Sequence, residues 1–382
     1  MLTLVKDTID NNDIDRLISW LKTYPRLTKG EVTLQFEDKF SKWLGRKYSV
    51  FCNSGSSANL LMLSVLQQSN SLKNKKVVVP SVAWATDLSP VMQLGFEPII
   101  CDSNLRDLSA DLIHLEQIFK EESPSILMFV SVLGLVPEMK KIVNLCRKYD
   151  VILLEDTCES MGSEYRGKKL GTFGKMSSFS TFFGHHISTI EGGIISTDDF
   201  ETYELLKSIR SHGWDRDLSE ETQKKLQKEW GVSEFEAMYT FYNQGFNLRS
   251  TDLQAYIGLT QIDKLKKWGE KRENNLFKYQ DLINNNYWKV STDLNDFNSN
   301  FAYPIIHPNK KNIVKKLLEN KVETRPMICG SMGTQPFYVK KYGECKLKKA
   351  SEIDKYGFYI PNNPHLTYDN LVFISKIVNS EL

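Results

Sequence analysis

Cysteine is scarce in this sequence, and its copies are far apart. The 382 residues contain six cysteines, which are Cys52, Cys101, Cys146, Cys158, Cys329 and Cys345. No C-x-x-C pair occurs, which excludes the closely spaced cysteine motifs of zinc sites and iron–sulfur clusters. The chain is long and its N-terminal segment lacks an apolar leader, so we expect reduced thiols and no disulfide framework.

The sequence also lacks an excess of one charge, a long apolar run and a high content of glycine and proline. Lys and Arg number 49 against 47 Asp and Glu, without the basic excess of a nucleic-acid-binding protein. The longest apolar stretch, Ile126–Val136, is about half a membrane span. With 21 glycines, 12 prolines and 41% hydrophobic residues, the composition is globular, neither fibrous nor disordered. We therefore expect a soluble, cytoplasmic protein of about two to three domains that binds neither nucleic acid nor membrane.

Short apolar, β-branched runs alternate with helical patterns over residues 1–250. Runs such as Val77–Val79 and Ile126–Val130 are apolar throughout, which is typical of strands buried on both faces of a parallel sheet. The predicted strands are Tyr48–Cys52, Lys76–Pro80, Glu97–Cys101, Ser125–Ser131, Val151–Glu155, Ser177–Phe182 and Gly193–Thr197. The predicted helices are Ser57–Gln68, Thr86–Leu94, Asp111–Glu121, Glu138–Tyr149 and Phe200–Ser211. This order predicts an α/β fold with a mostly parallel, doubly wound sheet, whose ligands bind beyond the carboxyl ends of the strands.

The pattern changes after about residue 250. Thr251–Asn285 has the apolar spacing of a long, charged amphipathic helix. Shorter elements follow it, a strand near Phe301–Ile306 and helices at Lys311–Glu319 and Tyr368–Ile377. We predict a large domain over 1–250 and a smaller α/β domain over 251–382 that includes the long linking helix. The charged run Glu220–Glu229 indicates a solvated face.

Small polar residues join the first predicted strand to the next helix, at Asn53–Asn59. Small residues such as Gly55 and Ser56 let the backbone approach an anion, and a helix N-terminus offers N–H groups and a positive dipole end. This pattern favours phosphate binding, but an ordinary N-cap turn also explains it, because serine is a preferred capping residue.

Three acids follow the apolar run Val151–Leu154, at Glu155, Asp156 and Glu159. Asp156 stands at the site-forming end of a buried strand. A carboxylate there can pair with a protonated ring nitrogen, as pyridoxal phosphate (PLP) enzymes require to make the ring an electron sink. A metal ligand or a structural helix cap are the competing interpretations.

Two further segments carry ring side chains beyond predicted strands. Phe182–Gly193 contains the adjacent pair His185 and His186. Adjacent histidines do not face one metal from one regular face, so a single histidine acting as general acid or base is easier to arrange. Trp84 follows the strand Lys76–Pro80 and could stack on a cofactor ring. Taken alone, both features also suit structural roles in the core.

Taken together and in this order, these motifs resemble the DegT-type sugar aminotransferases, a family of fold-type-I PLP enzymes. The resemblance covers nearly the whole chain. It includes the phosphate turn Ser54–Ala58, the aspartate motif Glu155–Gly162, the triplet Glu191–Gly193 and the loop Gly245–Arg249. The family implies an aspartate-aminotransferase-like fold and a homodimer with shared active sites, in which Asn247 reaches the cofactor phosphate of the other subunit.

One position departs from that family. Where the aminotransferases carry the lysine that binds PLP as a Schiff base, we expect His186, which cannot form that bond. The exchange resembles the 3-dehydratases that use pyridoxamine phosphate (PMP) to make 3,6-dideoxysugars. One branch of these adds a 2Fe–2S cluster, for which this sequence has no cysteine set. The chain is similar to the cluster-free branch, which acts on GDP-4-keto-6-deoxy-D-mannose in colitose biosynthesis.

The resemblance implies non-covalent PLP or PMP, L-glutamate as amino donor, a nucleotide 4-keto-6-deoxysugar as substrate, and no metal. His186 would be the catalytic base that moves a proton on the cofactor. The implied cofactor-binding residues are Gly55, Ser56, Trp84, Asp156, Glu159, Thr181 and Asn247. The implied substrate contacts are His212, Arg216 and Arg325, because arginine suits planar anion recognition.

Two alternatives stay open. One is an aminotransferase-like enzyme that acts on another nucleotide 4-keto sugar through the same PMP half-reaction. The other is a non-catalytic binding protein that kept the fold and lost the lysine. Retention of both the aspartate and the phosphate turn favours an enzyme.

Overall fold

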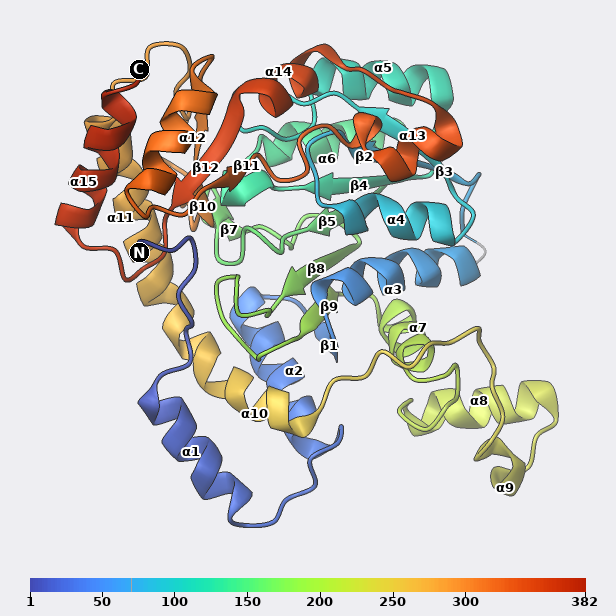
Figure 1. Cartoon of the computed structure of the whole chain (residues 1–382). Helices are drawn as coiled ribbons and strands as arrows, with labels where there is room; N and C mark the ends of the chain where they lie inside the picture. The colour runs from blue at the N-terminus through green and yellow to red at the C-terminus, as the bar shows by residue number, and fades with distance from the viewer. Residues whose placement is uncertain (70) are drawn as a thin grey trace.

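The computed structural model describes residues 1–69 and 71–382 and is built on a seven-stranded sheet (Figure 1). In order across the sheet, the strands are β1 (Tyr48–Cys52), β9 (Gly193–Thr197), β8 (Met176–Ser180), β5 (Ile152–Asp156), β4 (Ile126–Val130), β2 (Lys76–Pro80) and β3 (Glu97–Cys101). The pairs from β8 to β3 are parallel, and β9 is antiparallel to both of its neighbours. The predicted α/β fold with a mostly parallel sheet is confirmed.

Helices cover both faces of this sheet. Val77 and Val79 pack in one apolar cluster and Val78 in another, because successive side chains of a strand point to opposite faces. The helices of the first cluster that pack against this sheet include α3 (Gly55–Gln68), α4 (Ala85–Gln93) and α7 (Phe200–Arg210), and the cluster continues into the C-terminal part. Those of the second are α5 (Leu112–Glu122) and α6 (Met139–Lys148). Burial on both sides explains the continuously apolar strand sequences.

A third cluster joins the N-terminal helices to the linking helix. α1 (Asn11–Leu21) and α2 (Glu31–Leu44) both contact α10 (Asp252–Gln261). Phe36 and Phe40 of α2 are fully buried there against β-sheet side chains such as Phe51. The predicted long helix contains one 3₁₀ turn, η2 (Ile262–Lys264), between α10 and α11 (Leu265–Leu282).

The C-terminal part forms a second, antiparallel sheet. Its strands are ordered β10 (Ala302–Ile306), β12 (Gly357–Pro361) and β11 (Arg325–Pro326). The accompanying helices are α12 (Lys310–Glu319), η3 (Met332–Thr334), α13 (Pro336–Tyr342), α14 (Lys348–Tyr356) and α15 (Tyr368–Asn379). Leu2 bridges to Val322, so both chain ends lie beside this part (Figure 1). The division at residue 250 stays a prediction.

The remaining elements are short or peripheral. They are η1 (Val132–Gly134), the hairpin of β6 (Glu164–Tyr165) and β7 (Lys168–Lys169), and the pair α8 (Glu220–Trp230) and α9 (Glu234–Ala237). α8 and α9 project from the body as an arm (Figure 1). No residue of α8 is buried, as its charged sequence indicates. Within the described residues, no helix combines the length and apolarity needed to cross a membrane.

Candidate active site

The phosphate turn lies at the N-terminus of α3, beside the ends of β5 and β8. Ser54 is the N-cap, and its Oγ accepts the Ser57 N–H at 3.1 Å. A Cβ on Gly55 would lie 2.8 Å from the Ser180 Cβ and 2.9 Å from the Cys158 Sγ, so only glycine fits. The first N–H groups of a helix have no partner within it, which leaves those of Gly55 and Ser56 for an anion. The structure therefore places both predicted residues in a cradle.

Asp156 is the last residue of β5 and is held by two neighbours. Its Oδ1 accepts the Cys158 N–H at 2.8 Å, and its Oδ2 accepts from the Asn59 Nδ2 at 2.6 Å. Asn59 is fixed in turn because its Oδ1 accepts from the Ser178 hydroxyl at 2.6 Å. The carboxylate is buried at the carboxyl end of the sheet, next to the α3 cradle. This is the position that a ring-nitrogen partner of PLP needs.

Glu159 lies on the turn after β5. Its Oε2 accepts the Leu133 N–H at 2.7 Å. Burial raises the pKa of this carboxyl to about 8, although the Leu133 N–H acts in the opposite direction. Glu159 is therefore protonated at neutral pH and can donate a hydrogen bond.

The histidine pair points in two directions. His186 is 2% exposed, and its Nε2 lies 2.7 Å from the Ser299 carbonyl oxygen. His185 is half-buried, with its ring centroid 5.5 Å from that of Phe301. The negative charge of Asp156 acts on the His185 ring. The buried loop therefore engages the His186 ring, whereas the Asp156 charge acts on His185. The catalytic role expected for His186 stays a prediction.

Burial sets the charge of both histidines. It lowers the pKa of His185 to about 4 and the pKa of His186 well below its usual value. The buried guanidinium of Arg272 adds to both shifts, whereas Asp156 opposes the shift at His185. Both rings are neutral at pH 7, which is the form that a general base requires.

The hydroxyl predicted to bind the phosphate belongs to Thr181, and the structure places Thr181 and its neighbour Ser180 in different surroundings. Thr181 is fully buried, and its Oγ1 lies 2.5 Å from the Thr189 Oγ1. Ser180, the last residue of β8, lies against Gly55. Neighbouring strand residues face opposite sides, so the contact with Gly55 favours Ser180 as the hydroxyl nearest the cradle. The phosphate contact expected for Thr181 stays a prediction.

Trp84 is 56% exposed, although it follows the fully buried end of β2. It is the N-cap of α4, and its backbone N–H donates to the Asp87 Oδ2 at 2.9 Å. The Ser56 hydroxyl donates to Thr86 on the same helix at 3.1 Å. This exposed ring beside the cradle suits stacking on a cofactor better than core packing.

His212, Arg216 and Asn247 form an outer cluster. Arg216 stacks between the rings of Trp214 and Tyr239, at 4.1 and 4.9 Å. The other two contact Arg249. Its Nε donates to the Asn247 Oδ1 at 3.1 Å, and its Nη2 lies 3.4 Å from the His212 Nε2. In the described part of the chain, no hydrogen bond or ring contact joins this cluster to Asp156 or His185.

Arg325 lies on β11, opposite Tyr359 of β12, and its side chain is 62% exposed. It pairs with Glu323 at 3.0 Å. The charges of Arg325 and Glu159 both act on the Tyr359 hydroxyl. The Tyr359 ring lies 6.2 Å from that of Phe301. The small sheet therefore reaches the same side of the site as the histidine pair.

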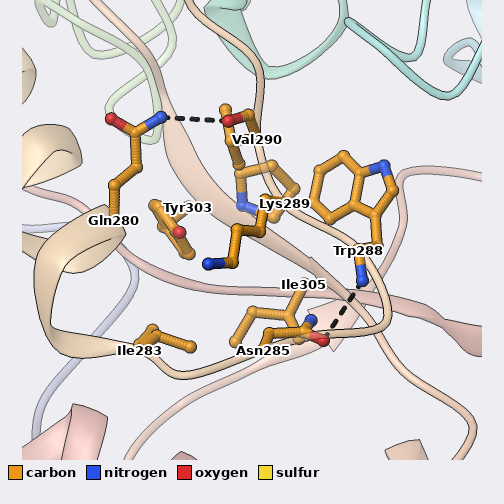
Figure 2. A pocket seen from close by; sticks show the side chains of 9 residues that line it. Gln280, Ile283, Asn285, Trp288, Lys289, Val290, Tyr303 and Ile305 are labelled. Atoms are coloured by element: carbon orange, nitrogen blue, oxygen red, sulfur yellow. Dashed lines mark hydrogen bonds between the residues drawn. The ribbon is translucent and has the colours of Figure 1, made fainter.

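A small, partly open cavity lies elsewhere, between β10 and the segment that follows α11 (Figure 2). Its volume is about 120 Å³, and its lining includes Gln280, Trp288 and Tyr303. Gln280 donates to the Val290 carbonyl at 3.0 Å at its edge. None of the lining residues belongs to the site around Asp156.

The residues around Asp156 fit PLP. The α3 cradle, closed to any side chain at Gly55, suits its phosphate, and the buried Asp156 carboxylate suits its ring nitrogen. The segment 176–193 contains no lysine. A covalent attachment from this loop is therefore excluded, and the cofactor would be held by contacts alone.

Sequence reasoning missed several residues of this site, namely Asn59, Asp87, Ser180, His185 as the facing histidine, Ser299 and Phe301. The position of Asn59 one turn after the phosphate cradle, on an apolar helix, was a usable signal. Phe301 and Ser299 precede a strand of the small sheet and carry no local motif.

Comparison with known proteins agrees with the geometry. The chain is 34% identical over 348 residues to a GDP-4-keto-6-deoxy-D-mannose 3-dehydratase of Yersinia pseudotuberculosis, covering 88% of each chain. A solved GDP-4-keto-6-deoxymannose-3-dehydratase mutant with bound GDP-perosamine has a TM-score of 0.90 at 30% identity, covering 99% of this chain and 100% of that one. The same enzyme with a trapped PLP-glutamate geminal diamine gives 0.89 at 30% identity, with the same coverage. The model of the DegT/DnrJ/EryC1/StrS aminotransferases matches residues 7–379, and the chain belongs to this family.

Proposed function

We propose that this protein is a PLP- and PMP-dependent 3-dehydratase that removes the 3-hydroxyl of GDP-4-keto-6-deoxy-D-mannose, with L-glutamate as amino donor. One observation carries the proposal. A neutral histidine, and no lysine, faces Asp156 in a site otherwise built for PLP. The likeness to 3-dehydratases over 88% of the chain supports the same conclusion.

The bound cofactor supplies an amine carrier and an electron sink. Asp156, fixed at the end of β5 by Asn59 and Cys158, would hold the proton on the ring nitrogen. The α3 N-terminus and Ser180 would hold the phosphate, and the exposed Trp84 would stack on the ring. These contacts replace the covalent bond that a lysine would form.

We assign the general base to His185. Its ring is neutral at pH 7, half-buried, and placed between Phe301 and the Asp156 side of the site. From there it can take a proton from the reacting carbon and return one to the departing 3-hydroxyl. A histidine cannot recapture the cofactor as a lysine does, which favours elimination over simple transamination.

We also propose a homodimer in which Asn247 of the partner subunit completes the phosphate site. Asn247 is exposed and lies in the outer cluster, away from the histidine pair of its own chain. The neighbouring arm exposes large apolar side chains, Trp230, Phe235, Tyr239 and Phe241. Such a surface favours a protein contact, and Arg216 lies against it, with its guanidinium 4.9 Å from the centre of the Tyr239 ring.

The direct test has two steps. Purified protein with PLP and L-glutamate should lose the aldehyde absorption band and release 2-oxoglutarate. GDP-4-keto-6-deoxy-D-mannose should then yield the 3-deoxy product and ammonia. Release of 2-oxoglutarate with turnover only of a CDP-, UDP- or dTDP-linked sugar would move the assignment to another nucleotide sugar. PLP binding without any glutamate reaction would favour a binding protein.

A further inference from the structure

A second buried carboxyl stands behind Asp156. Asp87 lies in the first turn of α4 and is fully buried. Its Oδ1 is 3.1 Å from the Asn59 Nδ2, and the same nitrogen is 2.6 Å from the Asp156 Oδ2. The negative charge of Asp156 also acts on Asp87. Two acids from separate elements therefore meet at one amide.

No cation neutralises this pair among the charges that act on Asp87. The titratable groups that face it are Asp156, Glu159, Cys158 and Cys329. Burial and the Asp156 charge raise the pKa of Asp87 well above its usual value, whereas the Trp84 N–H opposes them. Two buried carboxylates that share one amide nitrogen do not both stay ionised in a dry site, so the pair keeps one proton.

We propose that Asp87 holds this proton and donates it as a hydrogen bond to Asp156, which makes Asp87 a positioning residue for the cofactor. The Asp87 O–H would fix the Asp156 carboxylate toward the ring nitrogen, while its Oδ2 fixes the Trp84 backbone. One buried side chain would thus align the ring's charge partner and its stacking partner. The role toward the cofactor rests on the proposed function, whereas the shared proton does not.

The shared proton is tested without cofactor, on Asp87→Asn. A carboxyl whose pKa is raised on folding keeps a proton that the unfolded chain releases, so its contribution to stability falls as the pH rises above about 4. The melting temperature of the wild type, relative to Asp87→Asn, should therefore fall steadily between about pH 5 and about pH 8. An infrared band of a protonated carboxyl at neutral pH should also be lost in the variant.

Asp199→Asn is the matched control. Asp199 caps α7, is exposed, and has a lowered pKa. Its difference from the wild type should stay constant over the same pH range. If the melting temperatures of Asp87→Asn and the wild type change in parallel with pH, and the infrared band is unchanged in the variant, the shared proton is overturned.

The positioning role is tested by PLP affinity. Asp87→Asn keeps a donor beside Asp156 and should bind PLP about as well as the wild type at pH 7. Asp87→Ala removes the donor and should raise the PLP dissociation constant by roughly tenfold or more, because hydrogen bonds to charged groups are the strong ones. Folding of this variant is checked by its melting transition at about pH 5. Unchanged affinity in a folded Asp87→Ala would overturn the role, whereas failure of the proposed function would appear separately, as absent turnover in the wild type.

Discussion

Gly55 and Ser180 approach each other so closely that a Cβ on residue 55 would lie 2.8 Å from the Ser180 Cβ. This contact joins the N-terminus of α3 to the end of β8 and brings backbone N–H groups and a hydroxyl to one point. The cradle depends on the missing side chain. Four predictions follow from this and the other contacts of the site.

Gly55→Ala should damage the cradle. The added methyl group must displace Ser180 or Cys158, at a cost of about 1–3 kcal/mol for overpacking. We expect a lower melting temperature and at least roughly tenfold weaker PLP binding by absorbance titration. Gly231→Asn is the control, since Gly231 caps α8 with φ +64 and a Cβ there meets nothing within 4 Å. Wild-type PLP affinity in Gly55→Ala would contradict the cradle.

Substitution of the two histidines should have different effects on turnover and on stability. His185→Asn should lower kcat for the dehydration by about 10²–10⁴, the usual contribution of a general base, while the melting temperature stays near that of the wild type. His186→Asn should keep most of the turnover and lose stability, because it breaks the buried contact with the Ser299 carbonyl. The reverse pattern would return the catalytic role to His186.

Ionisation of Glu159 should cause the fall in activity on the alkaline side of the pH profile. Its pKa is raised to about 8, so the carboxyl is protonated below that pH and ionises above it. We expect kcat/KM of the wild type to fall above about pH 8, where the site gains a negative charge. Glu159→Gln imitates the protonated form and should keep its activity at neutral pH while losing this limb. An unchanged pH profile in Glu159→Gln would exclude Glu159 as its source.

The shared site should appear in hybrid dimers. His185→Asn and Asn247→Asp should each inactivate the enzyme. If each site takes His185 from one subunit and Asn247 from the other, a hybrid of the two variants contains one intact site. Mixing after reversible dissociation should restore about a quarter of wild-type activity. No recovery, with hybrids shown by mass spectrometry, would place both residues in the same subunit's site.

Several features could be predicted from the sequence because their cause is local. The strands Tyr48–Cys52, Lys76–Pro80 and Gly193–Thr197 have the predicted bounds, since short apolar runs between turn residues are a strong strand signal. The small residues around Gly55 and the acid after a buried strand likewise indicated where a phosphate and a ring nitrogen would bind. These inferences depend only on residues that are neighbours in the sequence.

Other features needed the tertiary contacts. The run Met176–Phe183 mixes serines with phenylalanines, so its pattern alone does not say which residue ends the strand. Pairing of β8 with β9 ends at Ser180 opposite Gly193, two residues before the predicted end. Since side chains alternate along a strand, that register decides that Ser180 faces the cradle and Thr181 does not.

The sequence by itself determined the fold class and predicted the cradle around Gly55 and the acid Asp156, because hydrophobic period, small turn residues and strand ends are properties of short segments. Only the tertiary structure decided that the Asp156 charge acts on His185 while His186 contacts Ser299, and that Asn59 joins Asp87 to Asp156. Those contacts unite residues from separate helices, strands and loops. Their geometry depends on how the whole chain packs, and no local pattern encodes it.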